Sequence, residues 1–221
     1  MNLKSFGCSF MFGCELPDDG YGTAYATPSQ MTWPALLAQS QGWGYQCYAR
    51  PGAGNMHIAE RLLTALASTS EPDFYVVNWT WIDRFDYVDF RTDKWLTLRP
   101  SENDNHGNYY YRNFHSQFRD KFSTLSMVQL CLDQLQKRSV PFVMTYMDEL
   151  MFETEFHTTP ALTAMQNSIR PHMTTFDGDN FVNWSRKQGH AISDLCHPLT
   201  DAHQACYRYI EPQLASMPLS V

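Results

Sequence analysis

The sequence lacks several features that mark broad classes of protein. None of its apolar runs reaches the roughly 18 residues of a membrane-spanning helix, and the apolar stretch at its N-terminus is too short for a signal peptide. We therefore expect a cytoplasmic protein without a membrane span. Basic residues are also few, 16 against 23 acidic ones, which gives a net charge of −7. This excess of negative charge argues against a protein that binds nucleic acid.

Cysteine pairs of the type Cys-x-x-Cys are absent, and the six cysteines show no spacing typical of a disulfide framework. We expect reduced, mostly buried thiols. Linkers rich in Gly, Ser or Pro and internal repeats are absent too, so the chain is predicted to form one domain over residues 1–221. What the chain does have is aromatic residues, 14 Phe, 12 Tyr and 6 Trp, and this content excludes intrinsic disorder.

Short apolar runs alternate with amphipathic segments along the chain. Continuous apolar runs such as FYVVNW are typical of central parallel strands. The alternation predicts an α/β fold, a three-layer α/β/α sandwich with a parallel sheet of about five strands, as in flavodoxin-like proteins. Strands are expected near residues 3–7, 45–48, 74–79 and 142–147, and helices near 33–39, 56–67, 114–137, 161–169 and 200–214.

Residues 84–113 interrupt this alternation. They are rich in Asp, Asn, Tyr and Arg and show no helical period, so we expect an inserted loop or hairpin region. The aromatic side chains of the insertion could stack on sugar rings, line an acyl pocket or pack the insertion onto the domain, and the last is favoured. These side chains are Tyr87, Phe90, Trp95, Tyr109, Tyr110 and Tyr111.

Polar and glycine residues fall where the carboxyl ends of parallel strands meet, which is the usual ligand site of an open α/β sheet. Ser9 lies in the turn after the first strand, where its hydroxyl could act as a nucleophile or cap the next helix. Gly54 and Asn55 follow the second strand. Their N–H and amide groups could bind an oxyanion, although a plain turn with an Asn helix cap explains the same residues.

Asp194 and His197 lie three residues apart before the last expected helix. A carboxylate at this spacing can hold one imidazole nitrogen and leave the other facing outward, which fixes the tautomer and raises the basicity of the ring. Pro198 biases His197 away from helical conformation and holds it on a loop. A chance Asp/His pair on a solvated loop is the alternative. Together with Ser9, the pair supplies the groups that acyl transfer needs.

These segments resemble the sequence blocks of the SGNH/GDSL hydrolase family. FGCSFMFG at 6–13 is similar to the first block, PGAGN at 51–55 to the second, and DLCHP at 194–198 to the Asp-x-x-His fifth block. The resemblance covers most of the chain by the order of its blocks, although only about twenty residues are identical. It implies an SGNH-hydrolase-like fold.

The resemblance also implies a serine esterase that hydrolyses an acyl or acetyl ester through an acyl-enzyme intermediate. Ser9 would be the nucleophile, His197 the base and Asp194 the orienting acid. The N–H groups of Ser9 and Gly54 would form the oxyanion hole, with Asn55 as an added amide donor. The expected substrate is a small-molecule or carbohydrate ester, and no cofactor is expected.

The chain departs from the family pattern at two positions. Cys8 replaces the aspartate of Gly-Asp-Ser, whose role is mainly structural. The Gly-x-Asn-Asp block after the third strand falls on residues 80–83, so Ile82 stands where the oxyanion asparagine is expected. Arg84 is then expected at the pocket mouth together with Thr80.

Three side chains could replace the missing amide, namely Asn55, Asn78 and Thr80, or the hole rests on backbone donors alone. Asn55 is favoured because it approaches from the neighbouring loop and carries an amide. Asn55→Ala is therefore expected to lower kcat by about tenfold or more with little change in melting temperature. Asn78→Ala is expected to act mainly on stability.

Other site chemistries are less favoured. Histidine, cysteine and aspartate crowd into residues 190–206, but their spacing matches no zinc pattern, so no metal site is predicted. A Cys8 nucleophile paired with His197 is conceivable, yet Cys8 is expected to point into the core beside the sheet. The alternative from another functional class is a catalytically weak or inactive binding module, for example for carbohydrate.

Overall fold

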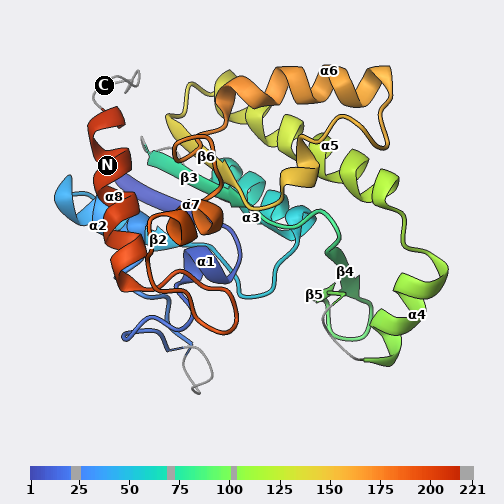
Figure 1. The fold of residues 1–221 in the computed structure, drawn as a ribbon, viewed down its shortest axis with the longest axis horizontal. Coiled ribbons are helices and arrows are strands. Elements are labelled where there is room, and N and C mark those ends of the chain that lie inside the picture. Colours follow the sequence, from blue (N-terminus) through green and yellow to red (C-terminus); the bar gives the residue numbers. More distant parts are fainter. Residues whose placement is uncertain (21–25, 69–72, 101–103, 215–221) are drawn as a thin grey trace.

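The computed structural model describes residues 1–20, 26–68, 73–100 and 104–214 and has a parallel sheet between two layers of helices (Figure 1). The expected α/β architecture is confirmed. Among the described residues, four parallel strands pair in the order β2-β1-β3-β6, and a parallel bridge from Met144 to Met173 is added at β6. The strands are β1 (Asn2–Phe6), β2 (Gly44–Cys47), β3 (Asp73–Trp79) and β6 (Phe142–Tyr146).

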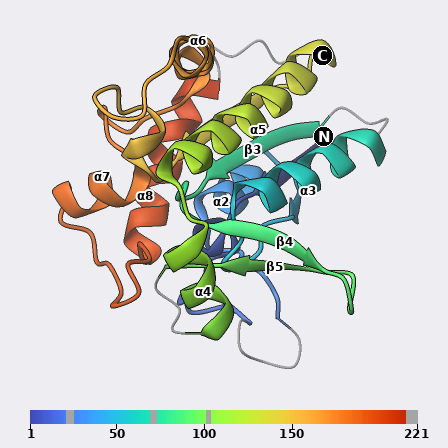
Figure 2. The ribbon, with the colours of Figure 1, turned by 90° about the vertical axis from the view of Figure 1, so that its right-hand side faces the viewer.

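Helices cover both faces of the sheet (Figures 1 and 2). One face carries α1 (Ser9–Phe12), α2 (Trp33–Ser40), α7 (Phe181–Lys187) and α8 (Thr200–Leu214). The other carries α3 (Asn55–Ser68), α5 (Gln117–Lys137) and α6 (Pro160–Ile169). Two short 3-10 helices, η1 (Glu149–Met151) and η2 (Arg170–His172), lie in the connections around α6.

The central strand β3 shows why the apolar runs form the middle of the sheet. Side chains alternate along a strand, so Phe74 and Val76 pack under α2 and α8, while Tyr75 and Val77 pack under α3 and α5. Every residue of β3 is buried. A strand covered on both faces needs apolar side chains at odd and even positions alike, which is what FYVVNW provides.

The chain crosses from one side of β1 to the other between β2 and β3, because β1 pairs with both. In open α/β sheets a ligand crevice forms outside the carboxyl ends of the strands at such a reversal. The loops after β1, β2 and β3 therefore meet at one edge of the sheet. That edge positions the candidate site.

Residues 84–113 contain an antiparallel hairpin, β4 (Phe85–Asp89) with β5 (Lys94–Leu98), followed by α4 (Asn105–Asn113). Sequence periodicity did not indicate α4, because the helix buries only Gly107 and Tyr110. Its start is set by Asp104, whose carboxylate accepts hydrogen bonds from the first turn. Figure 2 shows the hairpin and α4 beside each other at one end of the molecule.

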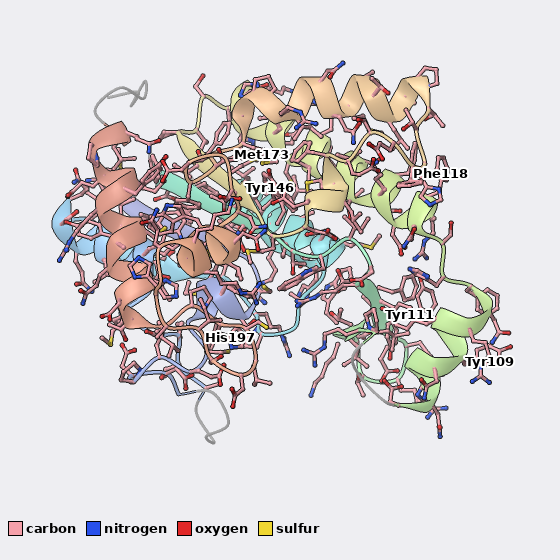
Figure 3. The ribbon with its side chains drawn as sticks, in the orientation of Figure 1. Tyr109, Tyr111, Phe118, Tyr146, Met173 and His197 are labelled. Atoms are coloured by element: carbon pink, nitrogen blue, oxygen red, sulfur yellow. The ribbon has the colours of Figure 1, made fainter. Side chains whose placement is uncertain are left out.

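One aromatic side chain of the insertion packs it onto α3, and others pack within the insertion itself. Trp95 stacks on His57 of α3 with ring centroids 5.0 Å apart, and Tyr110 stacks on Phe85 at 4.4 Å. The Tyr111 hydroxyl lies 2.7 Å from Asp83 O and 2.9 Å from Leu98 O, at the two ends of the hairpin, and can donate to either. Tyr109 is exposed, and Figure 3 shows it on α4, well separated from His197.

No helix in the described part of the chain is both long and apolar enough to span a membrane. All six cysteines are free thiols. Four of them are buried, Cys47 is partly buried and Cys196 is exposed. The expectation of mostly buried thiols is therefore confirmed.

Buried histidine makes the fold sensitive to acid. His203 on α8 is fully enclosed, its Nδ1 accepts the Trp33 N–H, and burial followed by repulsion from His197 lowers its pKa from 6.5 to about 3. The unfolded chain binds this proton below pH 6.5 while the folded chain does not. Each such proton costs about 1.4 kcal/mol of stability per pH unit until the folded pKa is reached.

We expect His203→Asn, whose amide oxygen can still accept the Trp33 N–H, to flatten the loss of stability between pH 6.5 and pH 3. Urea unfolding at several pH values measures this slope. His172→Asn is the matched control, because His172 is exposed. An unchanged slope in His203→Asn would show that His203 is not the group that takes up the proton.

Candidate active site

A cavity of about 640 Å³ opens at the carboxyl edge of the sheet. We call it the Ser9 pocket; its lining includes Ser9, Glu15, Gly52, Arg84, Arg99 and His197. These residues come from the loops after β1, β2 and β3, from the end of the hairpin and from the segment before α8. In Figure 1 that last segment, drawn in orange, runs beside α1.

Ser9 and His197 meet in this pocket although they lie 188 residues apart in the sequence. Ser9 begins α1, and its Oγ is 2.8 Å from Nε2 of His197. The Phe10 ring stands edge-on to the imidazole with centroids 5.1 Å apart, which fixes the plane of the ring. The structure thus brings together the serine and the histidine that the sequence singled out. Cys8, by contrast, is fully buried in the core.

The other imidazole nitrogen faces Glu15. Nδ1 of His197 is 2.5 Å from Oε2 of Glu15, and the Ser193 hydroxyl donates to the same oxygen at 2.5 Å. Burial works to raise the pKa of Glu15, but the hydrogen bonds from Ser193 and His197 outweigh it and lower the pKa below its usual value. Glu15 therefore carries a negative charge at neutral pH, next to the nitrogen that a catalytic acid would orient.

The expected contact between Asp194 and His197 is wrong. Asp194 is exposed and makes no hydrogen bond or ion pair with any described residue. The cause is the turn between them, in which Cys196 N–H donates to Ser193 O at 2.9 Å and Cys196 adopts a φ of 66°. The His197 N–H then donates to the Ser193 hydroxyl at 3.1 Å. With this turn the ring reaches Glu15 instead of the nearby aspartate.

The expected oxyanion role of Gly54 is contradicted as well. Its N–H donates to Oδ1 of Asp86 at 2.9 Å, and the His57 N–H donates to Oδ2 of the same carboxylate at 2.9 Å. Asp86, which comes from the hairpin, thus caps the N-terminus of α3. A Cβ at position 54 would lie 2.5 Å from this carboxylate, so only glycine fits there. The donor is already occupied and does not line the Ser9 pocket.

Asn55 is not in the pocket either. It is buried, its Nδ2 donates to Thr80 O at 3.1 Å and to Thr124 Oγ1 at 3.2 Å, and its Oδ1 accepts the Thr80 N–H at 2.8 Å. The amide therefore joins α3 to the end of β3 and to α5. The expected donation by Asn55 to a bound ester is wrong, because every polar atom of its side chain has a partner within the fold.

The remaining candidates for the missing amide are also turned away from the pocket. Thr80 is fully buried and its hydroxyl donates to Cys8 Sγ at 3.6 Å. Asn78 donates to Thr145 Oγ1 at 2.8 Å within the sheet. Ile82 is buried, and its N–H donates to Asp148. Of the pocket residues expected after β3, only Arg84 lines the Ser9 pocket.

Among the pocket residues that the sequence analysis did not single out are Glu15, Gly52 and Arg99. A signal for Glu15 was present, since it is the only charged residue in the stretch 5–17. Gly52 sits in the turn closed by Ala53 N–H to Arg50 O and adopts a φ of 80°, a conformation that favours glycine. Nothing local pointed to Arg99, because only the pairing of β4 with β5 carries it to the pocket.

Within the described residues, no group of three or more His, Cys, Asp or Glu side chains has an arrangement that could hold a metal ion. His197, Cys196 and Glu15 all line the pocket, yet Glu15 and the imidazole already bind each other.

No protein-family model matches the sequence, and no curated protein matches it. Solved structures do match. A carbohydrate esterase family 2 enzyme from Myceliophthora fergusii is 14% identical, with a TM-score of 0.52 over 97% of this chain and 65% of that one. The esterase EstA from Pseudoalteromonas is 11% identical, with a TM-score of 0.50 over 97% and 98%. A lipolytic G-D-S-L family protein from Veillonella parvula is 10% identical, with a TM-score of 0.46 over the whole of both chains.

The chain shares the fold of these esterases, as its resemblance to the SGNH/GDSL family implied. At these identities the likeness concerns the fold alone. In this fold the Ser9 pocket lies at the carboxyl ends of the strands.

Proposed function

We propose that the chain is a serine hydrolase that cleaves esters through an acyl-enzyme intermediate on Ser9. The observation that carries the proposal is the continuous hydrogen-bonded array of Ser9, His197 and Glu15 in an open pocket. A hydroxyl, an imidazole and a carboxylate in this order form the unit that activates serine on several unrelated folds. Glu15 takes the place that the sequence had assigned to Asp194.

Each group then has one task. Nε2 of His197 accepts the Ser9 proton as Oγ attacks the ester carbonyl, and the resulting imidazolium donates that proton to the departing alkoxide. Glu15 keeps the proton on Nδ1 and stabilises the imidazolium with its negative charge. Water, activated by the same nitrogen, then releases the acid and restores Ser9.

The oxyanion of the tetrahedral intermediate needs donors other than Gly54 and Asn55. The Ser9 N–H, at the first residue of α1, donates to no other described residue and stands beside the attacking oxygen. Gly52 lines the pocket, and its N–H likewise donates to no other described residue. We assign these two backbone groups to the oxyanion hole. Two donors instead of three make the enzyme slower on generic esters, since one donor contributes about 10²–10³ in kcat.

The second candidate function is a binding module that retains the fold with little or no turnover. The capping of α3 by Asp86 and the loss of the third-block asparagine to Ile82 favour it, because both remove oxyanion donors. Such a module would still bind esters in the Ser9 pocket. Binding without acylation is what separates it from an enzyme.

An acylation experiment decides between the two. Wild-type protein mixed with 4-nitrophenyl acetate and quenched in acid is expected to carry one acetyl group, which peptide mass spectrometry should locate on Ser9. Ser9→Ala is expected to carry none and to release no 4-nitrophenol above the uncatalysed rate. Equal release by wild type and Ser9→Ala would leave only the binding module.

A further inference from the structure

The insertion contributes charge to the Ser9 pocket. Its aromatic residues do not line the pocket, but Arg84 and Arg99, at its two hairpin ends, do. β4 pairs with β5 so that Phe85 lies opposite Leu98. The next residues outward are Arg84 and Arg99, so the register of the hairpin sets the two arginines side by side at its open end.

Arg84 is held in place by its neighbours. Its Nη1 donates to Ala53 O at 2.9 Å, and its guanidinium lies over the Trp81 ring, 4.8 Å from the centroid. Trp81 also lines the pocket. Stacking on an aromatic face leaves the edge of the guanidinium available for hydrogen bonds. Because the side chain is already ordered, binding a ligand costs it little further conformational entropy.

Arg99 lies against the turn that follows β2. A Cβ at Gly52 would be 3.2 Å from Nη1 of Arg99, so the absence of a side chain lets the guanidinium approach the backbone at the pocket wall. Gly52 is also one of the two proposed oxyanion donors. The second arginine therefore stands close to the place where the ester carbonyl would lie.

Two acidic residues, Glu15 and Asp83, line the same pocket. Glu15 is committed to His197 and Ser193. Asp83 lines the pocket as well, and burial, reinforced by Asp148, raises its pKa even though Arg84 acts against this. Arg84 and Arg99 are the arginines that line this cavity, and the hydrolytic steps do not use them.

We propose that the Ser9 pocket selects esters that carry an oxyanion, a carboxylate or a phosphate, which Arg84 and Arg99 bind. The ester part of this inference rests on the proposed function, whereas the oxyanion site stands on the two arginines. Charge-assisted hydrogen bonds from a guanidinium are shorter and about twice as strong as neutral ones, and two forks can grip one oxyanion. The two guanidinium groups would also attract an anionic group of the substrate.

Matched acetyl esters test the selection. 4-Acetoxybenzoate carries a carboxylate, its methyl ester is neutral, and 4-acetoxyphenyl phosphate carries a phosphate; the measured quantity is the ratio of kcat/KM for each anionic ester to that for the neutral one. We expect Arg84→Met and Arg99→Met each to lower this ratio by about tenfold or more, and the ratio to fall with added salt. Arg84→Lys, which keeps the charge, should lose less.

Arg91→Met is the matched control, because Arg91 lies at the exposed turn of the same hairpin. It should keep the wild-type ratio. Ratios that stay unchanged in both pocket variants, with folding verified by circular dichroism, would overturn the oxyanion site. The anionic ester whose kcat/KM ratio falls more in the pocket variants carries the preferred group, carboxylate or phosphate.

Binding separates failure of this inference from failure of the proposed function. Calorimetry with Ser9→Ala and benzoate or phenyl phosphate measures the oxyanion site without turnover. Suppose that the wild type hydrolyses no ester, and that Ser9→Ala binds the anions while Ser9→Ala/Arg84→Met does not. This result would refute the esterase and retain the oxyanion site. Ester hydrolysis by the wild type, with anion binding and ester preference unaffected by the arginine substitutions, would retain the esterase and refute the oxyanion site.

Discussion

Glu15→Ala is expected to lower kcat for a chromogenic ester by about 10⁴-fold, the typical loss when the orienting acid of a serine–histidine unit is disabled. The carboxylate of Glu15 lies against Nδ1 of His197, so without it the ring loses both its fixed tautomer and the charge that stabilises the imidazolium. Asp194→Ala removes the same charge from an exposed side chain of the neighbouring loop. It should leave kcat within about twofold of wild type.

The backbone of Glu15 gives a second readout. Glu15 adopts a φ of 68°, a conformation that costs a residue with a Cβ about 1 kcal/mol or more relative to glycine. Glu15→Gly should therefore remove activity as fully as Glu15→Ala while melting above it. A loss of kcat in Asp194→Ala comparable to that in Glu15→Ala would contradict this assignment.

Asn55→Ala is expected to reduce the free energy of unfolding by about 3 kcal/mol and the melting temperature by roughly 6–12 °C. The Asn55 Nδ2 donates to Thr124 Oγ1 and to the carbonyl oxygens of Thr80 and Trp81, and its Oδ1 accepts the Thr80 N–H. Alanine would leave the buried Thr80 N–H without a partner. The sequence had predicted the opposite, a lower kcat with little change in melting temperature. Urea unfolding measures the change.

Asn78→Ala is the matched control, because it removes a buried amide of the same size. Asn78 makes one hydrogen bond, to Thr145, and its Oδ1 has no partner. The expected loss is therefore about 1 kcal/mol. An Asn55→Ala variant that is no less stable than Asn78→Ala would show that the contacts of Asn55 do not hold the loop.

The fold was predictable from the sequence because local pattern and burial agree. The apolar run of β3 is buried on both faces. The helix expected at 161–169 is present as α6, and its start is capped by the Thr159 hydroxyl, which accepts the Leu162 N–H. The number of strands was less certain from pattern, since beyond β6 the structure has a single bridge at Met173. A bridge of one residue leaves no periodicity to detect.

The site was only partly predictable, for a physical reason. Ser9 follows the strand β1, and His197 precedes the helix α8, and both elements have a clear hydrophobic pattern. Sheet topology alone therefore brings the two residues to the same edge. Which acid reaches His197 depends on the left-handed turn at Cys196, and that conformation has no signature in a residue other than glycine. The Gly54 N–H donates to Asp86 instead of facing the pocket. Asp86 belongs to the insertion, and the pattern of strands and helices in the sequence does not predict where the insertion packs.

The central claim is that Ser9, His197 and Glu15 act as one unit, and the rate at which a fluorophosphonate modifies Ser9 tests it most directly. The reagent reacts only with an activated serine, so turnover and substrate choice do not enter. Wild type and Asp194→Ala should be labelled on Ser9 at rates within about twofold, Glu15→Ala about 10³-fold or more slowly, and Ser9→Ala not at all. Labelling of Glu15→Ala at the wild-type rate, or label that persists in Ser9→Ala, would contradict the account.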